Sequence, residues 1–223
     1  MKKRNILYIS VMMFFLLVGC TNGESIESEI SNHLDESVTL EKEFKEQQSH
    51  ITDLEEQEQA IYEEILDLGM DDFDEIKSLS NEALEVIEEL VDTIEIEKDS
   101  LVASKEEFEK IKPLIDDLEE ETTKEKAEEL YDMMEKRFSA YDNLNEAYMA
   151  SLEAGEELYL LVQDEDATQD DLSEQVTVIN GHYDTILEEN DAFNTHTDTF
   201  NELKQEFYDV AGIETSYEED EED

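Results

Sequence analysis

The chain has 223 residues and a formal net charge of −51, with 66 acidic against 15 basic side chains. So large an acidic excess excludes the basic face that nucleic-acid binding needs, and it excludes a polybasic hold on anionic lipid. With 39% hydrophobic residues, one proline and no tryptophan, the composition favours a folded chain of long helices over a disordered one.

Residues 1–19 have the pattern of a secretory signal peptide. Lys2, Lys3 and Arg4 form a positive start, and the apolar run over 6–18 is too short to span a membrane, which needs about 20 residues. Removing residues 1–19 takes away these three basic residues and no acidic one, so the formal charge moves from −51 to −54.

The segment Leu17-Val18-Gly19-Cys20 resembles a bacterial lipobox, in which the cysteine carries a diacylglyceryl group and begins the mature protein. Cys20 is the only cysteine of the chain, so an exported protein cannot use it for an internal disulfide. Two acyl chains hold a protein stably on a membrane, which one chain does not. We therefore expect lipidation of Cys20 on the extracytoplasmic face of the cell membrane, followed by a short tether over 20–24. The alternative is an ordinary signal peptide that happens to contain a cysteine.

Apolar residues then recur at alternating steps of three and four, which is the spacing of a coiled coil or a long bundle. Four segments carry this pattern: 30–68, 76–118, 127–162 and 172–210. Short connections make neighbouring helices antiparallel. We predict an all-α fold over 25–212, an elongated antiparallel bundle or coiled coil of three to four long helices.

Polar residues interrupt these apolar seams. Such residues usually fix the register of packed helices at some cost in stability, and a binding role is the alternative. The interruptions are Ser37, Gln47, Glu58, Lys105, Asn190 and Thr197.

Local signals mark the helix boundaries. Leu68-Gly69 and Ala211-Gly212 are typical helix stops, and Pro113 predicts a kink or an early break in the second helix. The acidic tail over 213–223 is predicted to be disordered. Capping boxes are predicted at the pairs Asp72 and Glu75, Thr122 and Glu125, and, in a weaker form, Thr168 and Asp171.

Aromatic residues gather near one face of the third and fourth helices. At helical spacing we interpret them as core, with the tyrosine hydroxyls at the edge of the seam, and contact with sugars or peptides is the alternative. They are Tyr131, Phe138, Tyr141, Tyr148 and Tyr159, then Tyr183, Phe193, Phe200, Phe207 and Tyr208.

No motif indicates catalysis, a cofactor or a metal. The sequence lacks a phosphate-binding loop, a Gly-x-Ser-x-Gly elbow and an EF-hand loop. Its histidines, at 33, 50, 182 and 196, are never three or four residues apart, as a zinc site on one helix face would need. Carboxylate pairs are too numerous to be informative, and a rod with a narrow seam is expected to offer no cleft for hydrolysis.

The lipobox ending at Cys20, the acidic helical body over 25–212 and the near absence of Pro, Trp and Cys together resemble the YkyA-type cell-wall-binding lipoproteins of Firmicutes. The resemblance covers nearly the whole chain, and the lipobox is its one sharp motif. It implies association with the cell wall and supplies no active-site residue.

Three functions follow as hypotheses. The first is a non-enzymatic lipoprotein of the cell envelope that binds peptidoglycan or a partner protein, despite the negative charge that it shares with the wall. The second is a scaffold or spacer that binds another envelope protein through an exposed apolar stripe. The third is an enzyme acting on wall polymers, which would need a deep cleft with two opposed carboxylates. Candidates for the apolar stripe are Tyr62, Val86, Ile96 and Val102.

Overall fold

A computed structural model describes residues 25–68 and 72–213, and all regular secondary structure in these ranges is helical. The predicted signal peptide, the lipobox with Cys20, Gly69 and the tail from 214 onward lie outside the described residues. The helices are α1 (Ile26–Leu40), α2 (Lys42–Asp67), α3 (Phe73–Phe108), α4 (Ile111–Asp116), α5 (Glu121–Val162) and α6 (Gln169–Ala211).

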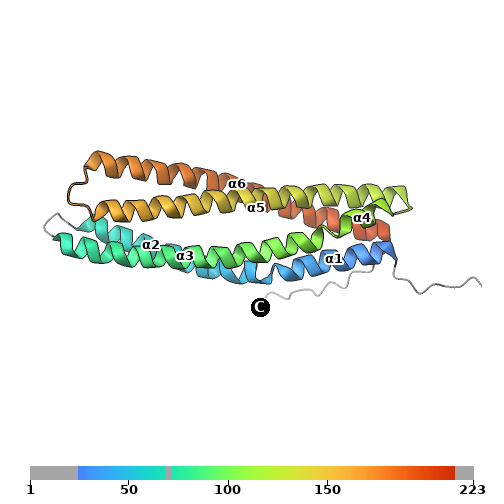
Figure 1. The fold of residues 1–223 in the computed structure, drawn as a ribbon. Helices are drawn as coiled ribbons and strands as arrows, with labels where there is room; N and C mark the ends of the chain where they lie inside the picture. Colours follow the sequence, from blue (N-terminus) through green and yellow to red (C-terminus); the bar gives the residue numbers. More distant parts are fainter. Residues whose placement is uncertain (1–24, 69–71, 214–223) are drawn as a thin grey trace, which may run out of the picture.

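The six helices form four long rods that pack antiparallel (Figure 1). α1 continues into α2, and α3 continues into α4, so these four make one hairpin; α5 and α6 make the second. The two hairpins lie side by side in an elongated bundle (Figure 1). The predicted all-α antiparallel bundle is confirmed. In the described ranges, no helix combines the length and the apolarity needed to cross a membrane.

The break between α3 and α4 has its cause in Pro113. A proline ring collides with the carbonyl group four residues earlier and offers it no N–H. That carbonyl belongs to Glu109, and α3 ends at the residue before it, Phe108. The predicted early break in the second helix is therefore confirmed.

The break between α1 and α2, at Glu41, was not predicted. The hydroxyl of Ser100 donates to the carbonyl of Leu40 at 2.7 Å and accepts from the backbone N–H of Phe44 at 3.1 Å. In an uninterrupted helix these two backbone groups would bond to each other. The serine is thus inserted into the hydrogen-bond ladder, which opens the first predicted helix into two.

Two of the predicted boundaries of the second hairpin are confirmed and one is wrong. α6 begins with the capping box of Thr168 and Asp171, and it ends at Gly212 in the left-handed conformation, with φ 68°. The predicted box of Thr122 and Glu125 does not form, because α5 begins earlier: Glu120 caps it by accepting from the N–H of Thr123 at 2.7 Å. The predicted box of Asp72 and Glu75 does not form either: α3 begins directly after Asp72, without a side-chain capping hydrogen bond.

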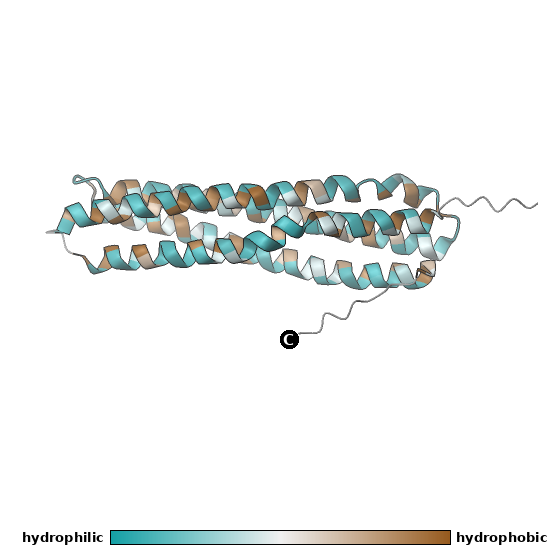
Figure 2. Ribbon diagram, turned by 90° about the horizontal axis from the view of Figure 1, so that it is seen from below, coloured by the Kyte–Doolittle hydropathy of each residue, from teal (hydrophilic) through white to brown (hydrophobic). Residues whose placement is uncertain are grey.

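The core divides into two clusters along the rod, and hydrophobic and hydrophilic residues alternate along each helix (Figure 2). The first cluster unites α1, α4 and parts of α3 and α5 with Phe193, Phe200 and Phe207 of α6. The second cluster is formed by α2, α3 and α5 and contains no residue of α6. The bundle therefore has a four-rod core in one half and a three-rod core in the other.

The first half of α6 departs from the prediction. Residues 169–190 form part of a predicted apolar seam, yet none of their side chains is buried. Tyr183 is 48% exposed. α6 packs chiefly on α5, and the core of this half closes without residues 169–190. The partly exposed seam residues are Leu172, Val176, Ile179, Tyr183 and Ile186.

Candidate functional site

A cleft runs between α2 and α6, mainly in the half of the bundle whose core lacks α6. It consists of two adjoining pockets with volumes of about 530 and 610 Å³. α2 and α3 form one wall, and α5 and α6 form the other. Both pockets are lined by Glu55, Tyr148 and Tyr183. The expectation that the rod has no cleft is therefore wrong, because α6 stays on α5 and does not close on α2.

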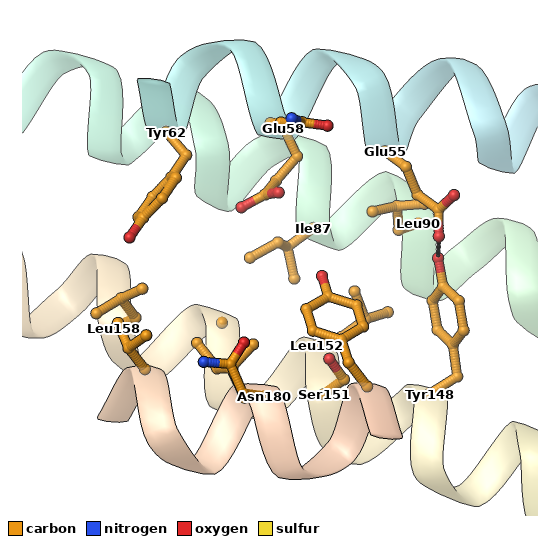
Figure 3. Close-up of a pocket in the computed structure, with 15 residues that line it drawn as sticks. Glu55, Glu58, Tyr62, Ile87, Leu90, Tyr148, Ser151, Leu152, Leu158 and Asn180 are labelled. Carbon is orange, nitrogen blue, oxygen red and sulfur yellow. Dashed lines mark hydrogen bonds between the residues drawn. The ribbon is translucent and has the colours of Figure 1, made fainter. Parts of the chain in front are cut away.

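The first pocket has an apolar floor and a polar rim (Figure 3). Ile87 of α3 and Leu152 of α5 belong to the floor. Glu58 projects from α2 into the pocket, with Asn180 of α6 on the opposite wall, while Glu55 points to Tyr148 of α5 (Figure 3). A carboxylate and an amide therefore face each other above aliphatic side chains.

Two tyrosine–glutamate hydrogen bonds connect α5 to α2 along the cleft. The hydroxyl of Tyr148 donates to Glu55, and the hydroxyl of Tyr159 donates to Glu58. Burial raises the pKa of Glu58, while the hydrogen bond from Tyr159 opposes the rise. Burial and the neighbouring carboxylates raise the pKa of both tyrosines, so their hydroxyls remain donors at neutral pH.

The second pocket holds a buried carboxylate, Glu97 of α3, which is 7% exposed. The amide nitrogen of Gln48 donates to it at 2.7 Å. Burial raises the pKa of Glu97 to about 7, although hydrogen bonding favours the charged form. Half of the Glu97 side chains are then neutral at that pH.

Tyr141 of α5 lies beside Glu97 and is 2% exposed. Its hydroxyl faces the carboxyl group of Glu97 and the side chain of Asn145, without the distance and angles of a full hydrogen bond. Burial, and then the charge of Glu97, raises the pKa of this tyrosine. A hydroxyl whose hydrogen bonding is incomplete at a pocket wall can accept a further hydrogen bond from a ligand.

The arrangement suits binding better than hydrolysis. Glu55, Glu58 and Glu97 all belong to the hairpin of α2 and α3, and tyrosines face them from α5. Hydrolysis by a carboxylate pair needs an acid on each side of the bond to be broken. The cleft therefore lacks the opposed carboxylates that the enzyme hypothesis requires.

The predicted apolar stripe does not form one surface. Val86 is buried, which argues against docking through that face, and Tyr62 lines the cleft. Ile96 and Val102 of α3 are exposed, at 48% and 44%.

The predicted aromatic face is largely core. Tyr131, Phe138, Tyr141 and Tyr159 are buried, and Tyr148 is half-buried with its hydroxyl at the edge of the seam. The sequence pattern located these tyrosines but missed their carboxylate partners. One signal was present, since Glu58 interrupts the apolar seam of the first predicted helix.

The histidines lie apart from the cleft. His33 bonds to Glu107 at 2.6 Å, and His50 approaches Glu89 at 3.3 Å. Among the residues that the structure describes, no three or more His, Asp or Glu side chains are grouped so that they could hold a metal ion.

Comparison with known proteins gives three matches. The family model YkyA, described as "Putative cell-wall binding lipoprotein", matches residues 25–210. The uncharacterized lipoprotein YkyA of Bacillus subtilis (strain 168) is 34% identical over 200 residues, which cover 90% of this chain and 89% of that protein. The crystal structure of a conserved protein of unknown function from Staphylococcus aureus has a TM-score of 0.71 at 16% identity, over 82% of this chain and 95% of that one. At that identity the likeness shows the fold alone.

Proposed function

The chain belongs to the YkyA family of lipoproteins, and from that premise we propose that it is a non-enzymatic protein that binds the cell wall through the cleft between its hairpins. Lipid on Cys20 would hold it on the extracytoplasmic face of the cell membrane. The observation that carries the proposal is the cleft itself, two adjoining pockets with carboxylates, amides and tyrosines above an apolar floor.

The composition of the cleft fits a polymer of sugars and short peptides. Binding sites for such ligands combine apolar surface with a few fixed polar groups. Tyr183 and Tyr148 present ring faces and hydroxyls, and Asn180 adds an amide. All of them lie on helices, so the site is held by rigid elements.

The charge of the protein limits how it can contact the wall. A body at −54 is repelled by anionic wall polymers, and its cleft carries carboxylates as well. Contact must therefore involve uncharged glycan surface, cationic groups of the wall or bridging by divalent ions.

Retention on purified wall tests the proposal. The full chain in mild detergent is mixed with purified sacculi at several salt and magnesium concentrations, and the bound fraction is measured after sedimentation. We expect retention of the wild type. Retention under none of these conditions would overturn direct wall binding.

A matched pair of variants tests whether the cleft is the site. Tyr183→Ala removes a ring that lines both pockets, and Leu160→Ala removes a similarly exposed side chain outside them. We expect Tyr183→Ala to reduce retention several-fold and Leu160→Ala to leave it unchanged. Equal retention of the two variants would place the contact elsewhere on the molecule.

A further inference from the structure

We propose that the pocket around Glu97 binds a primary ammonium group carried on a flexible aliphatic stem. This pocket, called the Glu97 pocket below, lies between α2, α3, α5 and α6. The inference rests on the proposed wall binding and names the chemistry of the ligand. In the wall, the side-chain amine of a stem peptide carries its ammonium on such a stem, and the alanyl ester of a teichoic acid is a second, shorter source of a primary ammonium.

The carboxyl group at the polar end of the pocket has no cationic partner among the residues that line the pocket. The carboxyl group of Glu97 is buried, and none of the residues that line the pocket is basic. Gln48 supplies one hydrogen bond and no charge. The nearby guanidinium of Arg137 contacts Phe193 but is already neutralised by Glu41.

An ammonium group would also complete the hydrogen bonding of this end. It has three donors and no acceptor. The carboxylate of Glu97 can accept one hydrogen bond, and the hydroxyl oxygen of Tyr141, whose O–H faces Glu97, can accept a second. The side-chain oxygen of Asn145, which lines the same pocket, is a third acceptor. A ligand that carried a carboxylate here would instead meet like charge.

The remaining walls suit the stem of such a ligand. Phe44, Tyr141 and Phe193 pack as an aromatic cluster with centroid separations of 5.7 to 5.9 Å. Aromatic rings attract cations and also bury methylene groups. Ile94 and Leu144 add aliphatic surface, and the volume of about 610 Å³ admits an extended side chain.

The pocket also gives binding a characteristic pH dependence. The titratable groups that share it with Glu97 are Glu55 of α2, Tyr141 and Tyr148 of α5, and Tyr183 of α6. The pKa values of these tyrosines are raised, so they stay neutral near pH 7. The carboxyl group of Glu97, with a pKa of about 7, is mostly neutral below that pH and mostly charged above it. An ammonium ion favours the charged form, so binding should strengthen as the pH rises.

Calorimetric titration with two small probes tests the proposal. N-acetylcadaverine carries one ammonium on an aliphatic stem, and N,N′-diacetylcadaverine is the same molecule without the charge. Each is titrated into the full chain in mild detergent at pH 6, 7 and 8. We expect the charged probe to bind at least tenfold more tightly. Between pH 6 and pH 8 its affinity should rise about tenfold, because the ionised fraction of a group with a pKa near 7 rises by that factor.

Two variants of α3 identify the group responsible. Glu97→Gln keeps the shape of the side chain and removes its charge, whereas Glu95→Gln removes an equal charge from an exposed position outside the cleft. We expect Glu97→Gln to weaken binding at least tenfold and to abolish its pH dependence, and Glu95→Gln to change neither. Equal binding of the two probes, binding of neither probe, or a pH dependence that persists in Glu97→Gln would overturn the proposal.

Chemically treated sacculi distinguish the sources of the amine and separate this proposal from wall binding itself. Retention that is lost on N-acetylated sacculi but kept after mild alkaline removal of alanyl esters points to the stem-peptide amine. Retention that is lost after both treatments points to teichoic acid. If both preparations retain the protein fully, the ammonium proposal fails while wall binding stands. If the charged probe binds and no sacculus does, wall binding fails and the ligand chemistry stands.

Discussion

Arg137 and Glu41 meet inside the bundle, with side chains 5% and 6% exposed. The two guanidinium nitrogens donate to the two carboxylate oxygens at 2.7 Å each. Thr197 accepts a third hydrogen bond from Arg137, and Ser104 donates to Glu41. The pair thus joins the junction of α1 and α2 to α3, α5 and α6, which explains why the seam positions around it are polar.

Breaking this ion pair should destabilise the fold strongly. Arg137→Met leaves the carboxylate of Glu41 buried without its cation, which costs about 3–5 kcal/mol of unfolding free energy. Urea denaturation followed by far-ultraviolet circular dichroism measures the loss. The double variant Glu41→Leu with Arg137→Met removes both charges and should recover most of it. A loss below about 1 kcal/mol in the single variant would contradict the burial of the pair.

Cys20 is the residue on which the proposed location depends. Its substitution by Ala removes the sulfur that would carry lipid, so the chain should leave the membrane fraction or keep its N-terminal segment. Cell fractionation and the electrophoretic mobility of the protein measure both outcomes. If Cys20→Ala fractionates and migrates like the wild type, the protein is not anchored through this residue.

At the scale of helices, prediction succeeded where the cause is local. Pro113 stops α3 through its own ring, and Thr168 with Asp171 starts α6 through contacts within one turn. The break at Glu41 could not be predicted, because its cause, the hydroxyl of Ser100, is about 60 residues away in sequence and arrives only when α3 packs. The spacing of apolar residues identifies a helix. It does not show where a side chain of a neighbouring helix interrupts the backbone hydrogen bonds of that helix.

Two glycines of α6 should respond oppositely to alanine. Gly212 has φ 68°, where a side chain is strained, so Gly212→Ala should lower the unfolding free energy by about 1 kcal/mol. Gly181 lies within the helix with open space around its Cα, so Gly181→Ala should raise stability by up to about 1 kcal/mol. Chemical denaturation of both variants checks the signs. A gain in stability for Gly212→Ala would contradict the left-handed end of α6, and a loss for Gly181→Ala would contradict the open space at that position.

At the scale of the whole molecule, the sequence pattern could not predict the cleft. Val176 and Ile179 belong to the same seam of alternating three- and four-residue steps as Phe193 and Phe200, yet the first two line the cleft and the last two are core. The difference arises from the partner rods. Phe200 and Phe207 bury α6 in the four-rod core at one end, while α2, α3 and α5 already close the other end without it. The helices and most tyrosines of the site were therefore predictable, and their separation by a cleft was not.

The charge of the whole molecule should make its stability depend on salt. With 66 acidic and 15 basic side chains, repulsion among surface carboxylates opposes the compact state. Raising the ionic strength from 0.01 to 1 M shortens the screening length from about 30 to about 3 Å. If this screening raises the unfolding free energy by about 2 kcal/mol, the melting temperature rises by about 4–8 °C. Thermal melts in NaCl, compared with MgCl2 at equal ionic strength, separate general screening from ion binding at particular sites. A melting temperature that stays constant or falls with NaCl would mean that surface ion pairs, such as those of Lys126 with Glu129 and Glu206, outweigh the repulsion.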